Sequence, residues 1–186
     1  MKIIIFFSLL LTFMCLSPIK AEAVGVGGSF VLTNQNGEQV TDENFRGHLM
    51  LVFFGFTHCP DLCPTTLATL SQAIGQLKDD SKKVAPIFIT VDPDRDTPAE
   101  MKTYLSHFNP AIIGLTGTQS QIDAVQEKYK TYALKVADKA SPGGYSFDHS
   151  AYIYLLDDQG KFLTVFTVNS STDTIVGKIK EYLKTK

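Results

Sequence analysis

The sequence has no excess of positive charge, and this absence excludes two classes of function. Its 17 lysine and arginine residues are outnumbered by 19 aspartate and glutamate residues, which gives a formal net charge of −2. A nucleic-acid-binding domain usually carries a basic patch that neutralises phosphates, and a polybasic segment attracts anionic lipid in a similar way. We therefore expect neither nucleic acid nor an electrostatic attachment to a lipid surface.

Internal repeats, low-complexity stretches and linker-like runs are also missing. A chain of 186 residues without such breaks favours one domain of ordinary size. Hydrophobic residues make up 44% of the chain and charged residues 19%, so the chain can bury a substantial core. We predict a single globular domain.

The N-terminus is typical of a cleavable export signal. Lys2 supplies a positive charge, residues 3–16 are almost wholly apolar, and Ala21-Glu22-Ala23 has the small-x-small pattern of a cleavage site. The apolar run is shorter than the ~20 residues that a membrane-spanning helix needs. We predict a signal peptide at residues 1–23 and a mature domain at residues 24–186. An uncleaved membrane anchor is the alternative.

Cleavage after Ala23 changes both the charge and the cysteine count. It removes two lysines and one glutamate, so the net charge becomes −3, and it removes Cys15, which leaves two of the three cysteines. We expect a periplasmic or exported protein; anchoring to the inner membrane is the alternative if the N-terminal segment is not cleaved. In such an oxidising compartment two neighbouring cysteines tend to pair, so a function that needs free thiols also needs a reducing partner.

The hydrophobic pattern predicts an α/β domain. Continuous apolar runs at 49–56 and 84–91 are typical of strands buried on both faces of a sheet. A thioredoxin-like fold, with a mixed central sheet flanked by helices and an N-terminal β-hairpin, accommodates this order. We further expect strands at 29–33, 112–115, 152–156 and 162–168, helices at 65–77, 120–132 and 172–183, a helix that begins at 97–100, and an irregular loop at 138–147.

Cys59 and Cys63 are the main candidates for function. They follow the strand predicted at 49–56 and precede a helix, the place where α/β sheets present their active sites. Four positions on a helical turn span about 6 Å, near the upper limit for a disulfide. A helix N-terminus favours the thiolate, and thiolates select soft ions such as Cu(I) or zinc. A purely structural disulfide is the alternative.

Two common cysteine sites are excluded by what the sequence lacks. There is no C-x-x-C-H motif for attaching haem. A closed structural zinc site takes four ligands, commonly as two closely spaced pairs. The four histidines include no such pair.

A third metal ligand would have to come from elsewhere in the chain. His48 precedes a buried strand and should lie at the opposite end from the cysteines, and His107 falls late in a predicted helix. His58 adjoins Cys59 and is better placed to tune its pKa than to bind the same ion. His149 follows the irregular loop and is predicted to open the next hairpin, from which it could reach the cysteines. From spacing alone, a structural role for His149 remains open.

Three segments resemble the Sco/SenC family of copper proteins: residues 55–64 (GFTHCPDLCP), 91–98 (VDPDRDTP) and 147–150 (FDHS). The resemblance implies a thioredoxin-like fold that holds Cu(I) or Cu(II) through Cys59, Cys63 and His149, with Asp148 orienting His149. It also implies a partner, cytochrome c oxidase subunit II, whose dinuclear copper site such proteins supply. Many members keep an N-terminal membrane anchor.

Two functional hypotheses follow. The first is a copper chaperone for assembly of cytochrome c oxidase. The second is a thiol–disulfide oxidoreductase that reduces the cysteines of the oxidase copper site, in which Cys59 attacks and Cys63 resolves. Both need a reducing thioredoxin-like protein that keeps the pair open. A peroxidase with Thr57 near Cys59 is a third, weaker hypothesis.

The aspartates of the second segment have two interpretations. Asp92, Asp94 and Asp96 either form an acidic rim that faces a partner or belong to a solvated loop. Neither interpretation makes them catalytic.

Overall fold

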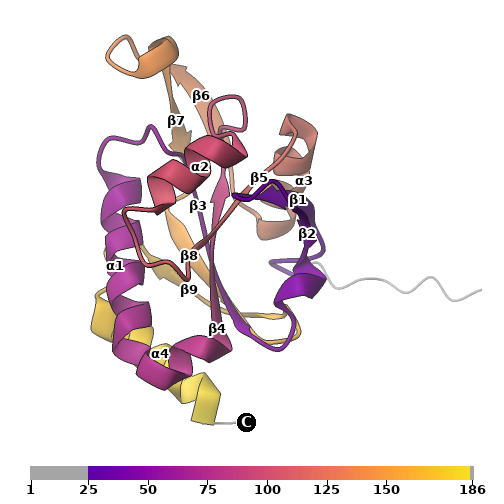
Figure 1. Ribbon diagram of the computed structural model, residues 1–186, viewed down its shortest axis with the longest axis vertical. Helices are drawn as coiled ribbons and strands as arrows, with labels where there is room; N and C mark the ends of the chain where they lie inside the picture. The colour runs from indigo at the N-terminus through magenta and orange to yellow at the C-terminus, as the bar shows by residue number, and fades with distance from the viewer. Residues whose placement is uncertain (1–24, 185–186) are drawn as a thin grey trace, which may run out of the picture.

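The computed structural model describes residues 25–184 and shows a seven-stranded mixed sheet with helices packed against it (Figure 1). The predicted signal peptide and Cys15 lie outside the described residues. The strand order across the sheet is β2-β1-β5-β4-β3-β8-β9. The predicted α/β class, mixed sheet and N-terminal hairpin are confirmed.

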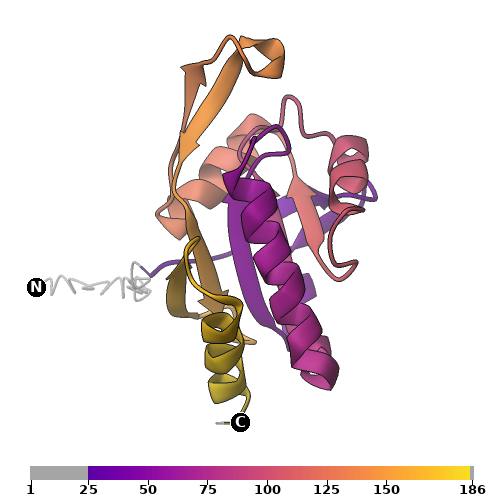
Figure 2. The same ribbon diagram turned by 90° about the vertical axis from the view of Figure 1, so that its left-hand side faces the viewer.

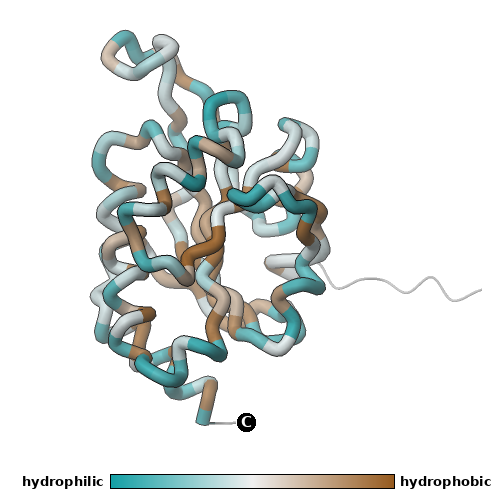
Figure 3. The backbone as a smooth tube through the Cα atoms, in the orientation of Figure 1, coloured by the Kyte–Doolittle hydropathy of each residue, from teal (hydrophilic) through white to brown (hydrophobic). Residues whose placement is uncertain are grey.

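The centre of the sheet consists of the two apolar runs. β3 (Leu49–Gly55) and β4 (Val84–Thr90) are parallel, and all fourteen of their residues are buried. β5 (Ile113–Thr116) continues the parallel pairing next to β4, and β8 (Tyr152–Leu156) pairs antiparallel with β3. Figure 3 shows the hydrophobic residues concentrated in these central strands. Such burial on both faces requires helices as cover.

The edges of the sheet are antiparallel. β1 (Val31–Asn34) and β2 (Gln39–Thr41) form the predicted hairpin, and β9 (Phe162–Thr167) pairs with β8 at the other edge. Short 3₁₀ helices follow β2 and α1 at Asp42–Phe45 and Lys78–Lys83.

Four α-helices occur near their predicted positions. α1 (Leu62–Leu77) and α4 (Thr172–Lys184) pack against each other, and α2 (Pro98–Leu105) packs on β5. Thr97 caps α2, since its hydroxyl accepts from the backbone N–H of Glu100, and Pro98 takes the first helical position as predicted. α3 (Gln119–Tyr129) ends three residues earlier than predicted, and the residue that follows it, Lys130, adopts the left-handed conformation.

One prediction is only partly right: residues 138–144 form a connecting loop, but the rest of the segment before β8 is regular. It forms a second, two-stranded antiparallel sheet of β6 (Ala133–Ala137) and β7 (Tyr145–His149), joined through a 3₁₀ turn at Pro142–Gly144. Figure 2 shows this hairpin projecting beyond the main sheet. All ten strand residues are exposed or half-buried, and the strand signal that the sequence does contain, the alternation of Tyr145 and Phe147 with Ser146 and Asp148, is only four residues long.

The prediction that His149 opens the next hairpin is therefore wrong. His149 is the last residue of β7. Among residues 25–184, no helix is long and apolar enough to cross a membrane.

Candidate metal centre

The end of β3 and the start of α1 place the two cysteines. After Gly55, the buried Phe56 leads into a short loop that carries Cys59, and α1 begins at Leu62. The helix starts earlier than the predicted residue 65, so Cys63 already lies in its first turn. Pro64 is tolerated there because the first-turn N–H groups have no partner within the helix.

Of the two thiols, Cys59 has the lower pKa. The backbone N–H of Cys63, at the start of α1, donates to Cys59 Sγ at 3.4 Å. Hydrogen bonding from the Cys63 side chain is the largest influence and, against the opposing effect of burial, helps to lower the pKa of Cys59 to about 4. A further contribution comes from the His149 side chain. Cys59 therefore presents a thiolate at neutral pH.

Cys63 is the buried partner. Its side chain is fully inaccessible, and its pKa is raised, first by its hydrogen bond to Cys59 and then by burial. The sulfur lies against the backbone of β3, because a Cβ built on Gly55 would lie 2.7 Å from Cys63 Sγ. Both cysteines are free in the structure, so the pair is in the open, reduced form.

His149 reaches the cysteines from the far end of the sequence. Its Nε2 lies 3.9 Å from Cys63 Sγ, a contact between residues 86 positions apart. The other ring nitrogen, Nδ1, lies 3.0 Å from the carbonyl oxygen of Ser150, and the ring packs edge-on against Phe56. Asp148, the residue expected to orient His149, is exposed and faces away from it, paired across the hairpin with Leu134. The carbonyl of Ser150 takes that place.

The distance between the sulfur and the imidazole leaves room for one ion. A sulfur and a nitrogen bound to the same ion at about 2.3 and 2.0 Å lie no more than about 4.3 Å apart. The observed 3.9 Å satisfies this limit. Within residues 25–184, however, no three His, Cys, Asp or Glu side chains are close enough together to hold a metal ion as they stand. A site with three ligands requires these side chains to move closer together.

The other three histidines lie apart from the pair. His58 turns toward Thr57 Oγ1, at 3.0 Å, and toward Asp96 Oδ1, at 3.9 Å. His48 is exposed just before β3, at the end of the strand away from the cysteines, as predicted. His107 is exposed after α2.

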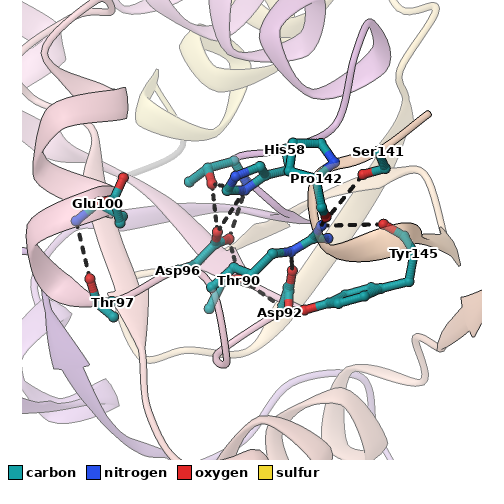
Figure 4. A network of polar contacts seen from close by, with 11 residues as sticks. His58, Thr90, Asp92, Asp96, Thr97, Glu100, Ser141, Pro142 and Tyr145 are labelled. Atoms are coloured by element: carbon teal, nitrogen blue, oxygen red, sulfur yellow. Dashed lines mark hydrogen bonds and ion pairs between the residues drawn. The ribbon is translucent and has the colours of Figure 1, made fainter. Parts of the chain in front are cut away.

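A buried aspartate fixes the loop that carries the cysteines. Asp96 is fully buried and accepts hydrogen bonds from the Thr57 amide at 3.0 Å, the Thr57 hydroxyl at 2.6 Å and the Thr90 hydroxyl at 2.5 Å (Figure 4). Burial raises its pKa, and the threonine donors oppose that rise. Thr57 thus anchors the loop to the end of β4, a role that sequence reasoning did not give it.

The interpretation of the aspartates as an acidic rim or a solvated loop is wrong for two of the three. Asp92 is 1% exposed and binds Arg95, and Asp96 is buried as described, because both serve as acceptors inside the protein. Only Asp94 is exposed. Hydropathy alone could not separate these residues, since alternate aspartates in a Pro-rich loop are typical of solvated turns.

Comparison with known proteins shows that the chain belongs to a family. The SCO1/SenC family model matches residues 19–184. A SCO2-like protein of Rickettsia felis is 42% identical over 166 residues, which cover 89% of this chain and 79% of the relative.

Two solved structures are also similar. Copper-bound ScoI of Bradyrhizobium japonicum is 46% identical with a TM-score of 0.79, covering 85% of this chain and 99% of that one. BsSco, described as having a disulfide switch and as a member of the Sco family of cytochrome c oxidase assembly proteins, is 27% identical with a TM-score of 0.67; the match covers 86% and 94% of the two chains.

Proposed function

Because the chain belongs to the SCO1/SenC family, we propose that it binds copper and delivers it to the dinuclear copper site of cytochrome c oxidase subunit II. The similarity to ScoI with bound copper supports copper as the ion. The similarity to a member of a family of oxidase assembly proteins supports the destination. We propose that the protein is exported and acts in the periplasm.

The proposed ligands are Cys59, Cys63 and His149. The observation that carries this assignment is the approach of His149 Nε2 to within 3.9 Å of Cys63 Sγ. Thiolates prefer Cu(I), and imidazole also suits Cu(II), so two sulfurs and one nitrogen serve both oxidation states.

Copper titration of the reduced protein tests this proposal. The wild type should bind one equivalent of Cu(I), and Cys59→Ser and Cys63→Ser should each abolish stoichiometric binding, because a single thiolate is left. His48→Ala, which removes an exposed histidine far from the pair, is the matched control and should bind like the wild type. Near-stoichiometric copper in either serine variant would contradict the assignment.

The asymmetry of the two thiols favours a second candidate function, reduction of the cysteines in the oxidase copper site. The Cys59 thiolate attacks the client's disulfide, whose S–S bond breaks as a mixed disulfide forms. Cys63 then loses its proton and attacks Cys59 Sγ, which releases the reduced client and leaves a Cys59–Cys63 disulfide. A reducing thioredoxin-like protein supplies the two electrons that reopen this disulfide.

Single-turnover reduction of a model disulfide separates the two functions. A reductase does not need the imidazole as a metal ligand, so His149→Ala should retain most of its thiol–disulfide exchange while its Cu(II) binding becomes much weaker. If the wild-type protein reduced the model disulfide no faster than a simple free thiol does, the reductase function would be excluded.

A further inference from the structure

The hairpin that carries His149 is not part of the main sheet. β6 and β7 pair only with each other in the part of the chain that the structure describes, from Ala133 opposite His149 to Ala137 opposite Tyr145. No backbone ladder joins them to the seven-stranded sheet. Besides the two-residue link from β7 to β8, the position of His149 over the cysteines therefore depends on contacts that side chains make.

One side chain outside the hairpin, Arg95, makes several of these contacts. Nη1 of Arg95 donates to the carbonyl oxygens of Pro142, at 2.6 Å, and Tyr145, at 3.2 Å, and to the hydroxyl of Ser141, at 3.4 Å (Figure 4). Its guanidinium carbon lies 3.8 Å from the centre of the Tyr145 ring. Arg95 thus reaches both the turn and the start of β7.

Arg95 is itself held from the main body of the protein. Its Nε binds the carboxylate of Asp92, which is 1% exposed, and Asp92 also accepts a hydrogen bond from the Tyr145 hydroxyl at 3.0 Å. The amide of Asp92 donates to the Thr90 hydroxyl at 2.9 Å, at the end of β4. A buried, charge-assisted contact of this kind has a well-defined geometry, which a flexible surface pair lacks.

Ring contacts along one face of β7 connect Tyr145 to His149. Tyr145, Phe147 and His149 share one face of the strand because side chains alternate. The Phe147 ring packs edge-on against Tyr145, with centroids 5.8 Å apart, and against Phe56, at 5.6 Å. Phe56 also contacts the His149 ring and directly precedes the cysteine loop. One continuous set of packed rings thus connects Arg95 to the imidazole.

We propose that Arg95, held by Asp92, is the positioning residue that keeps the β6–β7 hairpin in place and so brings His149 to the metal. Arg95 does not touch the metal; it acts through Tyr145 and the turn. The inference depends on the proposed role of His149 as a ligand.

Cu(II) binding by Arg95→Gln tests this inference. Residues that orient a metal ligand typically contribute about 10–100-fold to metal affinity. We expect Arg95→Gln to weaken Cu(II) binding by about that factor and to leave Cu(I) nearly unchanged, since the two thiolates suffice for Cu(I). Arg46→Gln is the matched control: it removes the same charge and a similar pairing with Asp42, far from the cysteines, and should have no effect.

Arg95→Lys separates geometry from charge. Lysine keeps the positive charge but not the planar guanidinium that bonds several acceptors and stacks on Tyr145. We expect Arg95→Lys to remain weakened for Cu(II). Full recovery in Arg95→Lys would mean that charge alone matters and would overturn the proposal.

A double-mutant cycle separates failure of this inference from failure of the proposed function. In a His149→Ala background, Arg95→Gln should cause no further loss of Cu(II) affinity, because its effect passes through the histidine. An equal loss in both backgrounds, or no loss in the wild-type background, overturns the positioning role. Unchanged Cu(II) binding in His149→Ala alone would instead overturn the ligand assignment.

Hydrogen exchange of the metal-free protein gives a readout that copper does not influence. Arg95→Gln should speed exchange of the β6–β7 amides at least several-fold while β3 and β4 stay protected. If this variant does not fold, Tyr145→Phe, which removes only the bond to Asp92, should show a smaller change in the same direction. Unchanged exchange throughout the hairpin in the variants that fold contradicts the proposal.

Discussion

At the scale of single residues, the two cysteines differ because they occupy different positions relative to α1. Cys59 lies before the helix and accepts hydrogen bonds from the Cys63 side chain and from the Cys63 N–H, so its negative charge is stabilised. Cys63 lies inside the first turn and is buried beneath Gly55, so its proton is retained. The Cys59 sulfur is thus a thiolate that can react or bind a metal, and the Cys63 thiol stabilises it by a hydrogen bond.

Alkylation of the reduced, metal-free protein as a function of pH tests this difference. A thiol with a pKa of about 4 remains a thiolate above pH 5, so Cys59 should react with iodoacetamide at a nearly constant rate between pH 5 and 8 and lose reactivity only as the pH falls through about 4. An ordinary thiol, with a pKa near 8.5, would instead slow about tenfold per pH unit below that value. Peptide mapping should find the label on Cys59.

Cys63→Ala is the matched variant for this measurement. It removes the thiol that hydrogen-bonds to Cys59, the largest cause of the lowered pKa, so the midpoint of the alkylation profile should move to higher pH. A midpoint that does not move would show that Cys63 is not the cause.

The site residues were predictable from sequence to different extents. Their types and spacing identified Cys59 and Cys63 as a candidate pair, because a C-x₃-C pair after an apolar run has few other interpretations. His149 emerged from the family resemblance, since spacing alone left a structural role open. The roles of Asp92 and Asp96 could not be predicted, because their partners Tyr145 and Thr57 are distant in the sequence.

At the scale of elements, the close approach of α1 to β3 sets the depth of the buried sulfur. A Cβ at Gly55 would lie 2.7 Å from Cys63 Sγ and 2.8 Å from the Phe88 ring. Contacts this short force a neighbour to move, and the neighbours here belong to the core.

Gly55→Ala should therefore destabilise the protein and disturb the site. We expect a loss of about 1–3 kcal/mol in the free energy of unfolding, which is typical of overpacking in a core, together with weaker Cu(I) binding. Gly75→Ala is the matched control. It lies in α1 with nothing within 4 Å of its Cβ position, and it should stabilise the protein by about 0.5–1 kcal/mol.

Urea unfolding of the two variants and the wild type measures both effects. A Gly55→Ala variant as stable as the wild type would show that α1 can retreat from β3 without cost, and that the sulfur does not depend on this glycine.

The elements themselves were predictable where their hydrophobic pattern is strong. The buried runs of β3 and β4 and the caps of α2 gave boundaries within a few residues. The β6–β7 hairpin was missed, although β7 alternates Tyr145 and Phe147 with Ser146 and Asp148, because its strands are largely exposed and contacts with Arg95 and Phe56 hold it in place. Local patterns do not encode such contacts.

At the scale of the whole molecule, the site joins segments from distant parts of the chain. The cysteines come from the β3–α1 junction and His149 from β7, so a metal ion bound to all three would cross-link the main sheet to the hairpin. An ion that binds only the folded arrangement stabilises the folded state by mass action.

Copper should therefore raise the melting temperature of the reduced protein. At free Cu(I) 100 times the dissociation constant, the stabilisation is about 2.7 kcal/mol, which for a domain of this size corresponds to a rise of about 5–10 °C. Cys63→Ser should show no rise under the same conditions. Equal rises in both proteins would mean that copper binds elsewhere.

The most direct test of the central claim is Cu(II) titration of the reduced protein beside His149→Ala, followed by the absorption of the thiolate-to-copper charge-transfer bands. The account predicts one equivalent of Cu(II) with strong bands in the wild type, and weak or absent bands in His149→Ala, which still binds Cu(I). No stoichiometric copper in the wild type, or identical Cu(II) spectra in the two proteins, would contradict a copper site built from Cys59, Cys63 and His149.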